Sequence, residues 1–317
     1  MNYAALRRPF AALLLGVALA QPAVAAERPA ARAASSTPVD NPAAHPSFTV
    51  RVVGKGRPVL LIPGLTCPGA VWDETVAHYQ SRYQCHVLSL AGFGGAAPVA
   101  GGPAAGLLPA VRDQLLAYVK TQKLDRPAVI GHSLGGFMGL WLSTTQPNAV
   151  GPLVILDSLP FLAAVQNPAL TAEAARPMAQ GMRQQMSAGR MPLAQQRQMV
   201  ATMVTDTAHQ ALVTRWGQAS DPASVAQAMY ELYTTDLRAD LGAVRQPALV
   251  LGTWAAYQPY GATLASTQAI FEAQYAKLPQ HRIEMSPAGK HFVMYDDKAW
   301  FFQQADAFLQ AHYAARK

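Results

Sequence analysis

Charged residues and cysteines are scarce in this sequence of 317 residues. Charged side chains make up 14% of the chain and hydrophobic ones 51%, which excludes a disordered or fibrous protein and favours one globular domain with room for an inserted subdomain. The formal net charge is +7, but the Lys and Arg residues are scattered along the chain. Without a basic cluster we expect no nucleic acid as a partner.

Cys67 and Cys85 are the only cysteines, and we expect no bond between them. Cys67 follows the end of one expected strand, and Cys85 lies near the start of the next, after a helix. In a parallel sheet these points lie at opposite edges, well beyond the roughly 7 Å that a disulfide allows between Cα atoms. Metal-ligand spacings, a phosphate loop and a dinucleotide fingerprint are also lacking, so we expect no cofactor and no metal.

A hydrophobic run long enough to span a bilayer is missing as well. Residues 10–20 are apolar but short, and they follow the basic pair Arg7 and Arg8. Small residues at 23–26 complete the pattern of a secretory signal peptide over residues 1–26, with a membrane anchor as the alternative. We therefore expect a periplasmic or secreted protein without stable membrane insertion; the arginine pair leaves twin-arginine export open.

Short apolar runs dominate the rest of the chain. We expect strands at 47–53, 58–62, 85–90, 127–130, 152–157, 247–252 and 281–285. Helices are expected between them at 71–83, 107–122 and 262–278, and a closing helix is expected after the last strand, at 299–314. Apolar strands that alternate with helices predict an α/β fold, a doubly wound, mostly parallel sheet covered on both faces.

The predicted sheet is interrupted once. Between residues 161 and 243 strands vanish and helical segments replace them, so we expect a helical cap inserted into a core of 47–160 and 244–317. Met178, Met182 and Met186 fall on one helix face there, which fits packing of the cap, an apolar roof over a substrate pocket, or both. Residues 27–46 are rich in Ala, Pro and Ser and are expected to form a linker or disordered arm.

A glycine-rich turn follows the strand at 127–130. Gly131-His132-Ser133-Leu134-Gly135 has a buried strand before it and an apolar helix after it, the context of a nucleophile elbow that raises a serine hydroxyl above a sheet edge. A side chain at Gly131 or Gly135 would strike the neighbouring backbone in so tight a turn. Ser133 is therefore the candidate nucleophile.

A serine nucleophile needs an adjacent base, and His291 is the candidate. It lies on a loop after the last strand, late in the chain, where the order Ser, Asp, His expects it. His132 is adjacent to Ser133 but is expected to point away from it. The other histidines fall in the linker, in helices or on strands.

The acid that orients the base is harder to assign. Its usual place, the loop after the strand ending at Gly252, holds no carboxylate. Asp157 ends the strand that follows the helix behind Ser133, and we expect it to reach His291; capping of a strand end is the alternative. Asp236 and Asp240 remain rivals. Asp296 and Asp297 are expected to be N-caps of the closing helix.

Charge that develops on a substrate oxygen requires two N–H donors. We expect the backbone of Leu134, the residue after the nucleophile, to supply one. The other should come from Leu65, in the loop after the strand at 58–62.

These motifs together make the chain resemble the α/β-hydrolase superfamily. It resembles the small capped bacterial hydrolases in which Pro-Gly-Leu and Gly-His-Ser-Leu-Gly-Gly recur, here at 63–65 and 131–136. The resemblance covers residues 47–317 and implies a helical lid, an acyl-enzyme on Ser133 and ester-type substrates. The missing acid after Gly252 is a departure, but some relatives, pancreatic lipases among them, place the acid one strand earlier, which matches Asp157.

We therefore expect a serine hydrolase that cleaves small-molecule carboxylic esters. Thioesters, lactones and amides remain open as substrates, because all of them pass through the same intermediate. Two other functions remain open: a ligand receptor with little turnover, and an acyltransferase. Nothing in the sequence indicates the oligomeric state.

Overall fold

The computed structural model describes residues 42–101, 106–165 and 167–314. The expected signal peptide at 1–26 and most of the expected linker lie outside the described residues. The last part of that linker is described: Pro42–Ala44 forms a 3-10 turn (η3), and His45 is buried, with its ring stacked on Phe48 at 4.4 Å between centroids. His45 therefore packs against the first strand, whereas Ala43 and Ala44 are exposed.

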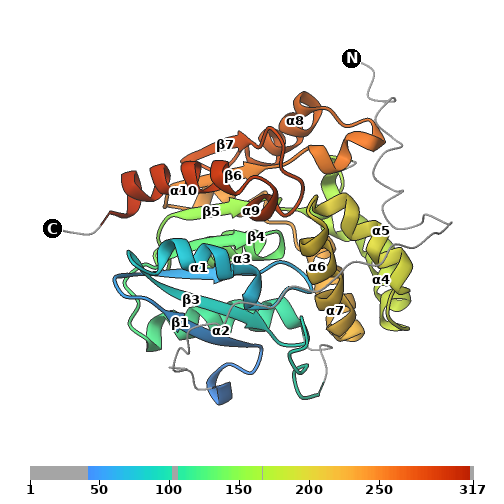
Figure 1. Cartoon of the computed structure of the whole chain (residues 1–317), viewed down its shortest axis with the longest axis horizontal. Helices are drawn as coiled ribbons and strands as arrows, with labels where there is room; N and C mark the ends of the chain where they lie inside the picture. The colour runs from blue at the N-terminus through green and yellow to red at the C-terminus, as the bar shows by residue number, and fades with distance from the viewer. Residues whose placement is uncertain (1–41, 102–105, 166, 315–317) are drawn as a thin grey trace.

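A seven-stranded sheet in the order β1-β3-β2-β4-β5-β6-β7 forms the centre of the molecule (Figure 1). β1 runs antiparallel to β3, and every other neighbouring pair is parallel. The strands are β1 (Phe48–Val53), β2 (Arg57–Ile62), β3 (Tyr83–Leu90), β4 (Ala128–His132), β5 (Leu153–Leu156), β6 (Ala248–Gly252) and β7 (His281–Met285). The predicted α/β class with a doubly wound, mostly parallel sheet is confirmed.

Helices cover both faces of the sheet. One face carries α2 (Leu107–Thr121), α3 (Leu134–Thr145) and α8 (Leu264–Tyr275), and the other carries α1 (Asp73–Tyr79) and α10 (Lys298–Tyr313). Alternate residues of one strand serve the two faces, because side chains alternate along a strand. In β2, for example, Leu60 and Ile62 join the first cluster, and Val59 and Leu61 join the second.

The helix expected at 71–83 is shorter in the structure. A 3-10 turn, η4 (Gly69–Trp72), precedes α1, and α1 ends at Tyr79. β3 already begins at Tyr83, because the backbone of this residue pairs with Arg57 of β2. Cys67 and Cys85 are both buried and both free, as expected.

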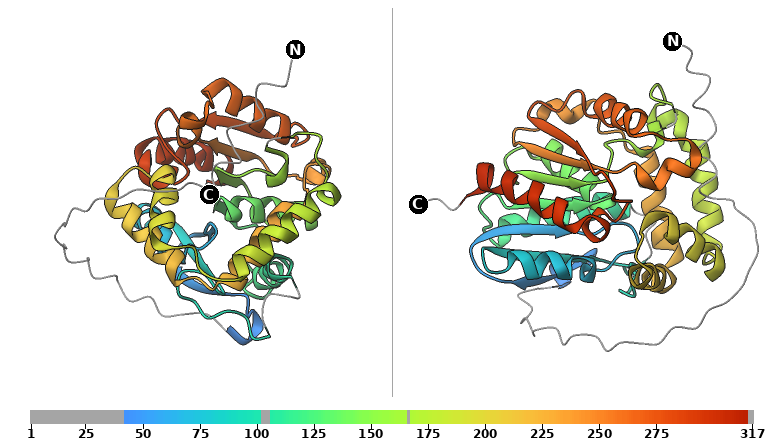
Figure 2. Two further views of the ribbon diagram at one scale, coloured as in Figure 1. Left: turned by 90° about the vertical axis from the view of Figure 1, so that its right-hand side faces the viewer. Right: turned by 45° about the horizontal axis from the view of Figure 1, so that its top comes forward.

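Between β5 and β6 the chain forms the helical insertion, residues 161–243. Its α-helices are α4 (Ala172–Ser187), α5 (Leu193–Met203), α6 (Thr207–Ala219) and α7 (Pro222–Thr234). α4 packs on α7 and α5 packs on α6, and both pairs lie at one end of the sheet (Figures 1 and 2). Short turns complete the chain: η6 (Leu162–Val165), η7 (Asp240–Ala243), η8 (Ala255–Tyr260) and α9 (Val293–Asp296). The described part of the insertion contains no strand.

The methionine face of α4 is only partly covered. Met182 and Met186 are half-buried, but the Met178 side chain keeps 50% of its surface exposed. The helix packs on α7 through its small residues instead, since Ala175 and Ala179 are its buried positions. Among the described residues, no helix is both long and apolar enough to cross a bilayer.

A buried carboxylate ties the insertion to the core. Glu231 of α7 accepts hydrogen bonds from the backbone N–H groups of Leu107 (2.9 Å) and Leu108 (2.7 Å). These groups open α2, where the first N–H groups of a helix lack acceptors and where negative charge is favoured. Gln227 donates a third bond to the same carboxylate at 2.8 Å. One side chain thus fixes α7 against the N-terminus of α2.

Candidate active site

Ser133 stands at the junction of β4 and α3 in a backbone conformation that few side chains adopt. Its φ is 51° and its ψ is −117°. A Cβ added at Gly131 would lie 2.2 Å from the carbonyl oxygen of Gly135, and one added at Gly135 would lie 2.0 Å from that of Ile62. The turn therefore requires both glycines, as the sequence indicates, and it holds the serine in a strained position that is typical of functional sites.

The two expected oxyanion donors belong to segments next to this serine, the start of α3 and the loop after β2. Leu134 is the first residue of α3, so its N–H belongs to the group that has no acceptor within the helix. Leu65 lies in the loop after β2, the parallel neighbour of β4. That loop passes close to the nucleophile, because a Cβ at Gly64 would lie 3.3 Å from the Cβ of Ser133.

His291 and Asp157 meet although they are far apart in the sequence. His291 lies on the loop between β7 and α9, and its Nδ1 donates a hydrogen bond to Oδ2 of Asp157 at 2.6 Å. Asp157 directly follows β5, is buried, and has a φ of +44°. Its other carboxylate oxygen accepts the N–H of Thr253 at 3.0 Å. Two hydrogen bonds thus compensate for the burial of this carboxylate.

The structure brings neither rival acid to His291 in this way. Asp236 binds Arg238 of its own loop at 2.7 Å, and Asp240 is exposed on η7. Tyr257 and Tyr275 do lie near Asp157, and burial together with its charge raises the pKa of both phenols. Both side chains therefore stay neutral at physiological pH.

His132 makes a contact that the sequence does not predict. The ring is buried, and its centroid lies 4.7 Å from that of His291 and 4.8 Å from that of Phe292. Its Nε2 donates a hydrogen bond to the backbone carbonyl of His291 at 2.9 Å. Burial first, and then the charge of His291, lower the pKa of His132 well below its ordinary value. The sequence does not predict which distant segment packs against this ring.

The helical insertion also holds the loop that carries His291. Lys290 Nζ donates to the carbonyl of Ala201 at 3.0 Å, and the N–H of Phe292 donates to that of Met203 at 3.1 Å. Both acceptors lie at the C-terminal end of α5, where carbonyl groups lack partners within the helix. The residues on either side of His291 are therefore bonded to the insertion.

The prediction that Asp296 and Asp297 are N-caps of the closing helix is wrong for Asp296, whereas Asp297 does occupy the N-cap position of α10. Asp296 ends α9, and its carboxylate accepts the N–H of Thr205 at 2.8 Å and that of Lys290 at 3.2 Å. Asp297 does precede α10, but its carboxylate accepts the hydroxyl of Ser286 at 2.7 Å and makes no cap bond. Both carboxylates therefore bind groups outside the closing helix and not the free N–H groups of its first turn.

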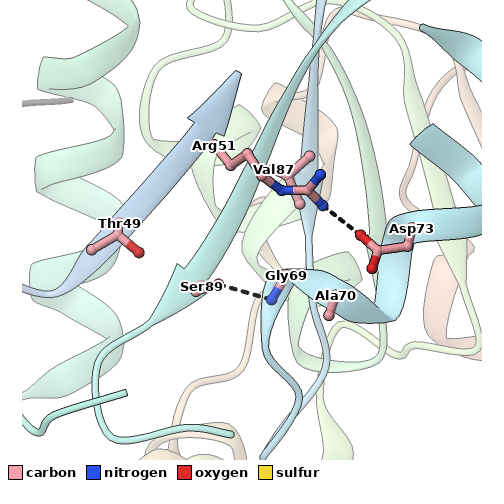
Figure 3. A pocket seen from close by; sticks show the side chains of 7 residues that line it. All are labelled: Thr49, Arg51, Gly69, Ala70, Asp73, Val87 and Ser89. Atoms are coloured by element: carbon pink, nitrogen blue, oxygen red, sulfur yellow. Dashed lines mark hydrogen bonds and ion pairs between the residues drawn. The ribbon is translucent and has the colours of Figure 1, made fainter. Parts of the chain in front are cut away.

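The described residues contain no cluster of three or more His, Cys, Asp or Glu that could hold a metal. A shallow hollow lies at the β1 edge of the sheet (Figure 3). Arg51 and Asp73 form an ion pair there, and Ser89 accepts the N–H of Gly69 at 2.8 Å. None of the candidate catalytic residues lines this hollow.

Comparisons with known proteins identify the family of this chain and proteins with a similar fold. The sequence model of the alpha/beta hydrolase family matches residues 59–304. The chain is 25% identical over 222 residues to the pimeloyl-[acyl-carrier protein] methyl ester esterase of Nitrosomonas europaea, covering 65% of this chain and 79% of that one. It is 32% identical over 111 residues to the esterase of the same name from Aliivibrio salmonicida, covering 35% of this chain and 40% of that one.

Solved structures show the same fold. The enol-lactonase from Burkholderia xenovorans LB400 superposes with a TM-score of 0.66 at 17% identity, over 83% of this chain and 96% of that one. A thermophilic esterase from Thermogutta terrifontis gives a TM-score of 0.65 at 18% identity, over 83% and 93%. Because the family model spans most of the sheet and the whole insertion, the chain belongs to the alpha/beta hydrolase family.

Proposed function

We propose that this protein is a serine hydrolase that cleaves carboxylic esters, with Ser133 as nucleophile, His291 as base and Asp157 as the residue that orients the base. The hydrogen bond from His291 Nδ1 to Asp157 Oδ2 at 2.6 Å carries this proposal. It holds the imidazole proton on Nδ1, which leaves Nε2 with a lone pair that can accept the proton of a serine hydroxyl. Ser133, on its strained elbow, is the serine that we propose donates this proton to Nε2.

The reaction proceeds in two halves. Ser133 Oγ attacks the ester carbonyl carbon while its proton passes to His291 Nε2, and a tetrahedral intermediate forms. The imidazolium returns the proton to the alkoxide leaving group, so an alcohol departs and an acyl group remains on Ser133. Water then attacks the acyl-enzyme by the same route and releases a carboxylic acid. Asp157 stabilises the imidazolium in both halves.

Backbone donors stabilise the intermediate. The N–H groups of Leu65 and Leu134 are proposed to bind the oxygen that becomes negative in each half-reaction. Leu134 also begins α3, and the positive end of a helix dipole favours that charge. Such donors act most strongly on the developing charge and little on the neutral ester, so they accelerate the chemical step.

The substrate class is proposed on two grounds. The two curated relatives compared above are named methyl ester esterases, and the two solved structures are named an enol-lactonase and an esterase. Ester cleavage also needs only the proposed groups, because an ester and a serine hydroxyl form an acyl-enzyme that water then hydrolyses. The chain spans only 40% of the length of the Aliivibrio esterase, so we carry over the ester linkage and not the acyl-carrier substrate.

Steady-state hydrolysis of p-nitrophenyl butyrate tests the proposal, with Ser133→Ala as control. Sustained turnover that disappears in the variant supports it, and labelling of Ser133 by a fluorophosphonate would agree. Equal turnover in both proteins would assign another nucleophile. A folded wild-type protein that binds the ester without turnover would be a receptor, and preferential transfer of the butyryl group to an added alcohol would identify an acyltransferase.

We also propose that the protein is exported to the periplasm or the medium. Support comes from the sequence alone: the basic Arg7 and Arg8, the apolar residues 10–20 and the small residues at 23–26. Cell fractionation with N-terminal sequencing tests this. A soluble exported protein that begins near residue 27 supports it, and an intact N-terminus retained in the cytosol or the membrane overturns it.

A further inference from the structure

His132 lies between the two loops that the proposed reaction depends on. Its ring contacts the rings of His291 and Phe292 on one side. On another side lies the loop before Leu65, since a Cβ added at Gly64 would approach Nδ1 of His132 to 2.7 Å. His132 is also joined directly to Ser133. One buried ring next to Ser133 therefore lies against two loops. These are the base loop (residues 286–292), which carries His291, and the oxyanion loop (residues 63–68), which carries Leu65.

The hydrogen bond of His132 determines its tautomer. The carbonyl oxygen of His291 only accepts, so the proton of His132 lies on Nε2, which donates over 2.9 Å. Nδ1 then carries a lone pair, and this atom is buried without a hydrogen-bond partner in the described part of the chain. A second proton on Nδ1 would be a buried charge facing a glycine backbone, which is strongly unfavourable.

A neutral His132 also suits the neighbouring base. During the proposed reaction His291 gains a proton and becomes an imidazolium. A positive charge on a ring centred 4.7 Å away would oppose that step, whereas a neutral ring does not. The lowered pKa of His132 keeps its ring neutral while His291 cycles.

We propose that His132 is a positioning residue: its Nε2–H fixes the backbone of His291 so that the base faces both Asp157 and Ser133. This inference rests on the proposed function. Asp157 restrains the ring of His291 at Nδ1, and the insertion holds the neighbouring Lys290 and Phe292, but neither of them binds the backbone carbonyl of His291 itself. The bond from His132 supplies that restraint, and near-attack geometry depends on such restraints.

Two substitutions of similar length separate the hydrogen bond from packing. His132→Gln keeps an N–H donor at about the reach of Nε2, and His132→Met has none. We expect His132→Met to lower kcat for p-nitrophenyl butyrate by about tenfold or more, with KM within about twofold. We expect His132→Gln to recover most of that loss.

The pH dependence of kcat/KM and the NMR signals of His291 provide further tests, because a loss of packing alone would leave both unchanged. In His132→Met, the acid limb of kcat/KM and the NMR titration of the His291 ring should shift together, and the low-field Nδ1–H signal of His291 should broaden or vanish. His132→Gln should keep the wild-type titration and signal. The NMR readouts need no turnover, so they decide the inference even if the protein proves not to be an esterase.

His86 provides a matched control. It is also a buried histidine on a strand, but its ring binds Tyr118 and Gln84, away from the candidate site. His86→Met should lower the melting temperature at least as much as His132→Met and leave kcat and the His291 titration unchanged. The inference is overturned if His132→Met matches the wild type, if the Gln and Met variants are equally impaired, or if His86→Met has the same effects.

Discussion

The backbone N–H of Thr253 donates a hydrogen bond to Oδ1 of Asp157 over 3.0 Å. Thr253 directly follows β6, and the loop that begins there holds no carboxylate. Its N–H reaches Asp157 because β5 and β6 are paired and end together. The loop after β6 therefore contributes a hydrogen-bond donor to this carboxylate and not an acid.

Asp157→Asn tests this arrangement. The amide oxygen can still accept the N–H of Thr253, but the amide NH2 would face His291 Nδ1 and favour the wrong tautomer. We expect kcat to fall by about four orders of magnitude, with circular dichroism and melting temperature close to those of the wild type. Asp240→Asn, at the exposed rival position, should keep full activity. Loss of activity in the second variant alone would reassign the acid.

Much of the fold follows from local patterns in the sequence. Strands buried on both faces are continuous apolar runs, which is why β2, β5 and β6 fall within a residue or two of their expected ends. The glycine requirement of the elbow is equally local, because it depends on contacts between Gly131 and Gly135. Patterns of this range can be read without knowledge of the tertiary structure.

The remaining features depend on contacts between distant segments. Asp296 is in a sequence context that suits a helix cap, yet its carboxylate accepts the N–H of Thr205 from the insertion. In sequence, His132 looks like any histidine at the end of a buried strand, and only the contact with the distant loop of His291 distinguishes it. The composition around His45 predicts a linker, but its ring stacks on Phe48, three residues away. That contact is local, and the composition rich in Ala and Pro conceals it. The partners of Asp296 and His132 are distant in sequence.

Two helical glycines should respond to alanine in opposite directions. At Gly135 the new methyl would meet the carbonyl of Ile62 at 2.0 Å, so Gly135→Ala should destabilise the protein by about 3 kcal/mol and distort the elbow. At Gly181 of α4 nothing lies within 4 Å of the new methyl. Gly181→Ala should therefore stabilise the protein by about 0.5–1 kcal/mol, because alanine favours the helix. Urea unfolding measures both, and equal effects would contradict the close approach at Gly135.

His86 should make the protein less stable in acid. Burial lowers its pKa from 6.5 to about 4. Between these values the unfolded chain binds a proton that the folded chain does not, so the free energy of unfolding falls as pH falls through this window. The contribution is about 3 kcal/mol and is fully present above pH 6.5.

Urea unfolding at pH 7.5 and pH 4.5 measures this dependence. His86→Gln keeps groups that can bond to Tyr118 and Gln84 but does not titrate, so it should lose part of the difference between the two pH values. An unchanged difference would show that His86 is not responsible for the acid sensitivity.

The bond between Asp296 and Thr205 should matter for catalysis more than for folding. It joins the base loop to the segment after α5, and the same carboxylate also holds the N–H of Lys290, the residue before His291. Asp296→Ala would release both N–H groups to solvent, since the carboxylate is only half-buried. The loop would keep the bonds that Lys290 Nζ and the N–H of Phe292 make to α5, and the bond from His132, but with two fewer restraints it would move more freely.

We expect Asp296→Ala to lower kcat/KM for p-nitrophenyl butyrate by about tenfold and the unfolding free energy by only about 1 kcal/mol. Hydrogen exchange of the amides at 290–292 should accelerate in parallel. Asp206→Ala is the matched control, because Asp206 caps α6 on the same insertion through a bond to His209 N at 2.9 Å. Its loss should cost about 1 kcal/mol of stability and leave kcat/KM unchanged. If both variants lose activity equally, the insertion acts on the site as a whole and not through the loop that carries His291.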